Sequence, residues 1–232
     1  MSPDHVSMRK YLSLSILLPL LFLAGGCGEK TMDEEDGEAR GGNARNSPET
    51  GASDSEGYDS LAILRERAGK DAALREEGSP IPEASRKAFT GLRYFPVDPK
   101  LVFQLELDTL AKPEPFKMAA TGGEVRAMRK LGHFRFTVDG QACTLSVFSS
   151  ESHPEILFVP FRDPTNGEES YEVGRYIDLE TRVDNRYLLD FNKAYNPYCA
   201  YNPDYTCPVV PNENILPAPI RAGEMVPAAP AH

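Results

Sequence analysis

The dipeptide Asp139-Gly140 constrains the fold more than any other short feature, because it separates two runs of alternating apolar and polar residues. Asp-Gly favours the two-residue turn whose twist matches that of a β-hairpin. A two-residue loop then places the apolar side chains on one face and the polar side chains on the other. The sequence therefore predicts an antiparallel hairpin with one buried face. Its pairs are Phe136–Cys143 and Phe134–Leu145 on the apolar face, and Arg135–Thr144 and His133–Ser146 on the polar face.

Further strands are predicted on both sides of this hairpin. Residues 101–107 alternate as a half-buried strand would, and residues 156–161 form a short, largely apolar run. Residues 175–179 and 187–191 are typical of two more strands. At least six strands with mostly short connections predict a mainly β (α+β) fold, in which an antiparallel sheet curls into a sandwich or partial barrel.

Helices are predicted only near the start of the domain. Leu61, Leu64, Ala68 and Ala72 recur at helical spacing among charged residues. A turn over residues 79–83 then leads into a second short helix that ends near Gly91. Short N-terminal helices therefore precede the sheet.

Regular structure is predicted to stop at Asn192. Eight of the last 41 residues are proline, which lacks the hydrogen-bond donor that a central strand needs. The same stretch contains four tyrosines before residue 206, whereas a disordered tail is poor in aromatic residues. We expect an ordered loop that wraps the sheet, with a frayed tail over residues 227–232.

The first 26 residues are typical of a bacterial export signal. Arg9 and Lys10 precede an apolar run over residues 11–23, which is shorter than the roughly 20 residues that span a bilayer. Ala24-Gly25-Gly26 leads directly to Cys27, and this resembles the lipobox of lipoproteins, in which that cysteine is lipidated. Ordinary signal cleavage beside an incidental cysteine is the alternative. Gly28 after the cysteine, by resemblance to sorted lipoproteins, permits delivery to an outer membrane.

An acidic segment separates this signal from the predicted domain. Residues 27–60 contain ten acidic and three basic side chains and almost no large apolar ones. Such a segment cannot bury enough surface to offset its ordering entropy, so a disordered tether is predicted over residues 27–57. A single β-rich domain is expected over residues 58–226. The net charge of −10 argues against nucleic acid as the main partner.

A succession of longer motifs resembles the domain-of-unknown-function 1684 family of bacterial proteins. Those motifs are Phe89–Pro96, Phe161–Gly167, Tyr171, Gly174–Tyr176, Leu189–Asn192, Ala194–Tyr201, Cys207-Pro208, Glu213-Asn214 and Ile220–Glu224. The resemblance covers most of residues 58–226. It implies a domain boundary, and it implies no activity.

The region from Phe161 to Tyr201 is dense in directional polar and aromatic groups. Pockets combine aromatic walls with a few fixed donors and acceptors, and an arginine can hold a carboxylate or phosphate. A site for a small polar or anionic ligand is one hypothesis. Turn formation at Asp163 and a strand-to-strand ion pair between Arg175 and Asp190 are the structural alternative. The candidate ligand residues are Asp163, Thr165, Arg175, Tyr176, Asp190, Asn192, Asn196 and Tyr198.

Catalysis and metal binding receive less support from the sequence. The predicted domain has only His133 and His153 as bases for a nucleophile, and neither lies in the motifs above. A hydrolase that uses paired carboxylates remains an alternative. Cys199 and Cys207 predict a disulfide in an oxidising compartment rather than a metal site, because two cysteines alone make a poor zinc site.

These inferences predict a membrane-anchored envelope lipoprotein that faces the periplasm or exterior, without a cofactor. The oligomeric state stays open. A structural or partner-binding envelope lipoprotein is the alternative to a ligand-binding one.

Overall fold

The computed structural model describes residues 57–227. The predicted signal segment, Cys27 and the acidic tether lie outside these residues, as does the tail from residue 228. Within residues 57–227, no helix has the length and apolar character needed to cross a membrane.

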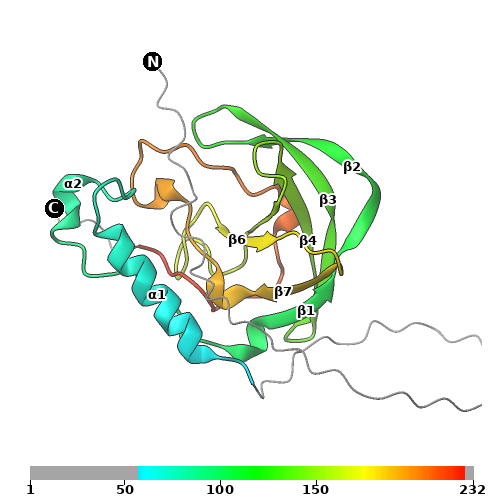
Figure 1. The fold of residues 1–232 in the computed structure, drawn as a ribbon, viewed down its shortest axis with the longest axis horizontal. Coiled ribbons are helices and arrows are strands. Elements are labelled where there is room, and N and C mark those ends of the chain that lie inside the picture. Colours follow the sequence, from blue (N-terminus) through cyan, green and yellow to red (C-terminus); the bar gives the residue numbers. More distant parts are fainter. Residues whose placement is uncertain (1–56, 228–232) are drawn as a thin grey trace, which may run out of the picture. The chain divides into compact units, whose positions relative to one another are not determined.

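The described chain is mainly β, as predicted, and contains two antiparallel sheets (Figure 1). The larger sheet has the order β2-β3-β4-β5-β6, and the smaller one pairs β1 with β7. The strands are β1 (Val102–Glu106), β2 (Asp108–Ala119), β3 (Val125–Val138), β4 (Gln141–Ser150), β5 (Ile156–Phe161), β6 (Arg175–Glu180) and β7 (Arg186–Asp190).

The β3–β4 hairpin has the predicted register. All four pairs expected from the sequence are present, and Asp139 and Gly140 both have positive φ angles, of 47° and 77°. Two successive positive φ angles are those of a type I′ turn, which explains why Asp-Gly occupies it.

The two sheets pack on each other through aromatic side chains. Phe103 of β1 lies 4.9 Å from Phe136 of β3, and Tyr187 of β7 lies 5.6 Å from Phe134, measured between ring centroids. Phe191 contacts the rings of Phe103, Phe136 and Phe161 and so joins the two layers. The fold is therefore consistent with a β-sandwich, and no barrel closes among residues 57–227.

Strand β2 was not predicted from the sequence. It forms the edge of the larger sheet, and its residues are mostly exposed on both faces, so no alternation of apolar and polar residues marks it. Pro113 and Pro115 also lie within it and remove two backbone donors. Prolines on an edge strand oppose pairing with another strand, so this composition suits an edge.

Helix α1 confirms the first predicted helix, and helix α2 is shorter than the second one predicted. Helix α1 spans Ser60–Leu74 and begins where the Asp59 carboxylate accepts a hydrogen bond from the Ala62 N–H. Helix α2 covers only Glu83–Arg86 and ends before Gly91.

The C-terminal segment wraps the sheets, as predicted. It consists of short 3-10 turns at Phe191–Lys193, Tyr198–Ala200 and Asn212–Asn214, joined to the sheets by isolated bridges. Leu216, Ala218, Ile220 and Ala222 are all buried in the main core, at every second position. This segment therefore closes one side of the core without forming a strand of its own.

Candidate functional site

Asp163 begins a tight turn and is almost fully buried. Its Oδ1 accepts hydrogen bonds from the Thr165 N–H, at 2.9 Å, and from the Ile220 N–H, at 3.1 Å. The Asn166 side chain in turn accepts from the Asp163 N–H, and Gly167 takes a φ of 91°. The Asp-Pro-Thr-Asn-Gly sequence thus folds locally as a turn whose carboxylate also fixes the C-terminal segment.

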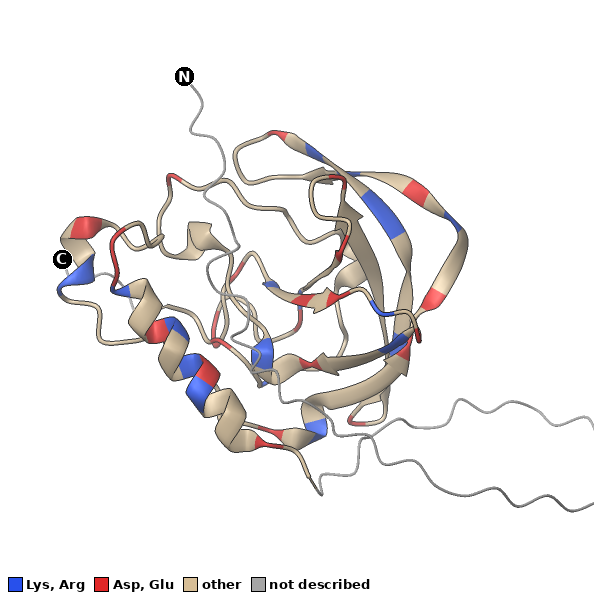
Figure 2. Ribbon diagram, viewed as in Figure 1, with Lys and Arg blue, Asp and Glu red and all other residues tan. Residues whose placement is uncertain are grey.

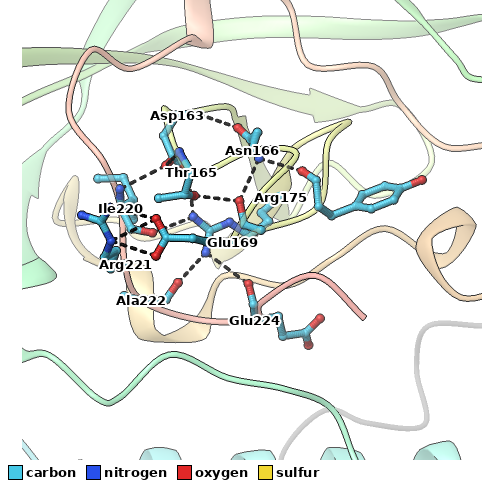
Figure 3. A network of polar contacts seen from close by, with 11 residues as sticks. Asp163, Thr165, Asn166, Glu169, Arg175, Ile220, Arg221, Ala222 and Glu224 are labelled. Atoms are coloured by element: carbon cyan, nitrogen blue, oxygen red, sulfur yellow. Dashed lines mark hydrogen bonds and ion pairs between the residues drawn. The ribbon is translucent and has the colours of Figure 1, made fainter. Parts of the chain in front are cut away.

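Arg175 lies at the start of β6, and its side chain is 0% exposed. Figure 3 shows it in a network of polar contacts with Asp163, Ala222 and Glu224. Nη2 donates to Asp163 Oδ2 at 2.9 Å and to the Ile220 carbonyl at 2.7 Å. Nη1 donates to the carbonyls of Ala222, at 2.5 Å, and Glu224, at 3.2 Å. Burial lowers the pKa of Arg175, and the Asp163 carboxylate opposes that shift. The guanidinium therefore joins β6 to a turn and to the C-terminal segment.

Thr165 extends this cluster by one layer. Its hydroxyl lies 2.7 Å from the Ser170 hydroxyl, which also accepts from the Asn166 side-chain amide. Thr165 and Ser170 are both essentially unexposed. We name Asp163, Thr165, Asn166, Ser170 and Arg175 the arginine cluster.

Asp190 and Asn192 meet in a second place, beneath α1. Asp190 Oδ1 accepts from the backbone and side-chain N–H groups of Asn192, and its Oδ2 accepts from the Tyr58 hydroxyl at 2.7 Å. The Asn192 side chain exchanges hydrogen bonds with the backbone of Asp98. Burial and the Asp190 carboxylate raise the pKa of Tyr58. The expected ion pair between Arg175 and Asp190 is absent from the described chain.

Asn196 belongs to a third group, around the Glu224 carboxylate. Glu224 Oε2 accepts from the Asn196 N–H at 2.8 Å and from the Tyr201 hydroxyl, while Oε1 accepts from Lys70 Nζ at 2.5 Å. Glu224 is 1% exposed, so Lys70 of α1 neutralises a buried charge. The Glu224 carbonyl also accepts from Arg175, which links this group to the arginine cluster.

Tyr176 and Tyr198 lie apart from these charges. The Tyr176 hydroxyl donates to the Pro208 carbonyl, and its ring packs on Phe158 and Tyr195. Tyr198 is half-buried and packs edge-on against Tyr205. The eight candidate residues therefore occupy several separate places rather than one pocket.

A shallow hollow of about 240 Å³ lies on the smaller sheet, lined by Gln104, Leu105, Glu106 and Arg186. None of the candidate residues lines it. Within residues 57–227, no group of three or more His, Cys, Asp or Glu side chains has the geometry of a metal site.

Cys143, Cys199 and Cys207 are free thiols in the structure. Cys143 is buried on the apolar face of β4, and burial raises its pKa. Cys199 and Cys207 are neighbours, because the Cys199 N–H donates to Cys207 Sγ at 3.3 Å. The disulfide expected between them stays a prediction.

Two further buried polar residues were not among the candidate ligand residues, although Asn214 lies in one of the motifs that resemble the family. Arg67 of α1 is buried and donates to the carbonyls of Phe95 and Asn192, and its spacing from Ile63 placed it on the buried face of the helix. Asn214 is 0% exposed and bonds both backbone groups of Ser146 and the Pro160 carbonyl. No local pattern marks Asn214, because its partners are more than 50 residues away in sequence.

Comparison with known proteins gave two findings. The family model described as "Protein of unknown function (DUF1684)" matches residues 87–225. The solution NMR structure of an uncharacterised protein of Haloarcula marismortui is similar at 35% identity and a TM-score of 0.56, over 71% of this chain and 92% of that chain. Among curated proteins, nothing matches.

Proposed function

The chain belongs to the DUF1684 family of proteins of unknown function, and we propose that it is a lipid-anchored protein of the cell envelope whose folded domain binds another protein. The lipid anchor would be Cys27, which follows a predicted export signal and small residues. Lipidation there would hold the domain on a membrane surface at the end of the acidic segment.

One observation carries the preference for a protein partner over a small ligand. The charged side chains that would hold a ligand are all buried, and each is engaged by protein groups. Arg175 has four internal acceptors, and Asp163 has three internal donors. Since opening such a cluster costs the desolvated hydrogen bonds, these residues suit a scaffold better than a recognition site.

The outer face of the β2–β3 ribbon supplies a surface for such a partner. Lys117 of β2 lies opposite Ala127 of β3, and Pro115 lies opposite Arg129, so these four side chains share one face. All four are exposed, whereas Met118 and Met128 on the other face are buried.

Charge on this outer face is uncompensated. Among residues 57–227, neither Lys117 nor Arg129 has an ion-pair partner, whereas Lys130 on the inner face pairs with Glu213. Basic positions recur along the ribbon as a whole, with acidic positions between them (Figure 2). An exposed face that mixes unpaired cations with small apolar groups fits an acidic protein surface.

Site-specific cross-linking in cells tests the partner. A photoreactive amino acid at Ala127 should give a discrete adduct with an acidic protein, and Lys117→Glu with Arg129→Glu should abolish it. The same group at Thr144, which is exposed on β4, is the matched control. Equal adducts at both positions, or none at Ala127, would refute the proposal.

Two further measurements address the anchor and the small-ligand alternative. Cys27→Ser should move the protein from the membrane to the soluble fraction, because lipidation needs that thiol; retention on the membrane would contradict the anchor. Native mass spectrometry of the Cys27→Ser chain, which carries no lipid, should show no added mass. A reproducible small mass that Arg175→Met removes would instead favour ligand binding.

A further inference from the structure

Two cysteines that belong to none of the polar clusters lie where the C-terminal segment meets the end of β2. Cys207 is fixed there by two hydrogen bonds with Thr121. The Cys207 N–H donates to Thr121 Oγ1, and the Thr121 N–H donates to the Cys207 carbonyl, both at 3.0 Å. Cys199 lies in the 3-10 turn Tyr198–Ala200, and its N–H donates to Cys207 Sγ. The hydrogen bond from the Cys199 N–H to the Cys207 sulfur therefore keeps the two cysteines next to each other.

The Cys199 sulfur is the centre of this arrangement. The Tyr171 hydroxyl donates to Cys199 Sγ at 3.8 Å. The thiol of Cys207 and the hydroxyl of Thr121 also stabilise a negative charge on that sulfur. The Cys207 thiol contributes most to lowering the pKa of Cys199 to about 6, against the opposing effect of burial. The pKa of Cys207 is raised, first by its contact with Cys199 and then by burial.

Cys199, the cysteine with the lowered pKa, is also more accessible to solvent than Cys207. Cys199 is half-buried and Thr121 beside it is exposed, whereas Cys207 is only 6% exposed. The charged and titratable groups around them are Tyr171, Glu172, Tyr176 and Arg126. A reagent from solvent therefore meets Cys199 first.

We propose that Cys199 is the nucleophilic thiol of a redox-active cysteine pair, with Cys207 as the resolving thiol, and that the pair exchanges with small-molecule disulfides. The Cys199 thiolate attacks one sulfur of a disulfide R–S–S–R, forms a mixed disulfide and releases R–S⁻. The Cys207 sulfur, on losing its proton, attacks the Cys199 sulfur and displaces the second R–S⁻. In total the two protein thiols lose two electrons and two protons, and the small disulfide becomes two thiols.

This inference goes beyond the disulfide expected from the sequence, which was a structural one. A structural disulfide gains nothing from donors arranged around one of its reduced sulfurs. Groups that stabilise the thiolate stabilise the reduced pair and make the disulfide easier to reduce. The Tyr171 hydroxyl bond to Cys199 Sγ and the adjacent Cys207 therefore favour a pair that cycles.

The test uses the full chain with Cys27→Ser and Cys143→Ala, which leaves the pair as its only thiols. The reduced protein is alkylated with iodoacetamide from pH 4 to pH 10, and each site is identified by peptide mass mapping. Cys199 should react with a midpoint near pH 6, and Tyr171→Phe should raise that midpoint by about one unit, since a hydrogen bond to a charged group is lost. A midpoint near the ordinary thiol value of about 8.5 would overturn the proposal.

Exchange is then measured with oxidised glutathione. The pair should lose two hydrogens and regain them when reduced glutathione is added. Cys207→Ser should accumulate one glutathione on Cys199, and Cys199→Ser should react at least tenfold more slowly. Equal reactivity of the two serine variants, or a pair that stays fully reduced or fully oxidised at every glutathione ratio, would overturn the proposal. Should Cys143→Ala not fold, the chain with Cys143 gives the same readouts, because peptide mapping separates the sites.

Discussion

The arginine cluster and the Cys199–Cys207 pair are both dense in polar groups, yet they differ in what those groups surround. Around Arg175, every hydrogen bond ends on another protein atom, and the side chain has no exposed surface. Around Cys199, the Tyr171 hydroxyl donates to the sulfur of a residue that is only half-buried. The comparison teaches that closure, meaning the exclusion of solvent from the polar groups, separates a scaffold from a reactive site better than the density of polar residues does.

The largest effect is expected where closure is complete. Arg175→Met leaves the buried Asp163 carboxylate without its ion-pair partner and several carbonyls without donors. Removing one partner of a buried ion pair costs about 3–5 kcal/mol, and the free energy of unfolding in urea should fall by that amount. Arg162→Met, at an exposed arginine before the same turn, is the control and should change it by less than about 0.5 kcal/mol. A loss below about 1 kcal/mol for Arg175→Met would show that the cluster is open to solvent.

The next effect tests how tightly the C-terminal segment is held against the sheets. Gly223 has a φ of 76°, and a Cβ there would lie 2.5 Å from the Ala194 carbonyl oxygen. Gly223→Ala should therefore lower the free energy of unfolding by about 2–3 kcal/mol, combining backbone strain with a steric clash.

Gly123 is the matched control for that substitution. Its φ is 84°, but a Cβ there would meet nothing within 4 Å. Gly123→Ala should cost only the backbone strain, about 1 kcal/mol. Equal losses at both glycines would mean that the segment near residue 223 yields to accommodate a methyl group.

The fold could be predicted from the sequence wherever a local rule acts. Asp139-Gly140 and the alternation around it determine the hairpin and its register without any distant contact. Strand β2 escaped prediction because an edge strand exposed on both faces shows no alternation, and its prolines argue against a strand.

The site was predicted less well, for a different reason. The sequence brought Asp163, Thr165 and Arg175 together as candidates, and they do lie together. Arg175 is satisfied within the buried cluster by the carbonyls of residues 220, 222 and 224, which are backbone groups that any sequence would supply. No residue type marks a backbone acceptor, so the sequence alone left ligand binding and scaffold as alternatives.

The Cys199 thiolate should make the free energy of unfolding depend on pH. The pKa of Cys199 is lowered to about 6 in the folded protein, against about 8.5 for an unfolded thiol. Between these values the unfolded chain binds more protons, so the stability of the reduced protein should be lost as the pH falls from 8.5 to 6. Allowing for solvent screening, a change of about 1–2 kcal/mol is expected.

Urea unfolding at a series of pH values measures this change. Cys199→Ser should remove it, and so should oxidation of the pair, since neither form has a thiolate at residue 199. If the free energy of unfolding still fell with pH in both forms, the pH dependence would belong to other groups. That result would weaken the contrast between the arginine cluster and the Cys199–Cys207 pair.

The smallest effect is expected at an ion pair that resembles the buried one in chemistry but not in closure. Arg221 makes a forked contact with the Glu169 carboxylate at 2.8–3.1 Å, a few residues from the carbonyls that bind Arg175. Its side chain is 58% exposed, so water screens the charges and little is gained by pairing them. Arg221→Met should change the free energy of unfolding by less than about 1 kcal/mol, and 0.5 M salt should abolish most of that change. A loss that approached the value for Arg175→Met would mean that forked geometry, rather than exclusion of water, determines how much an arginine stabilises this fold.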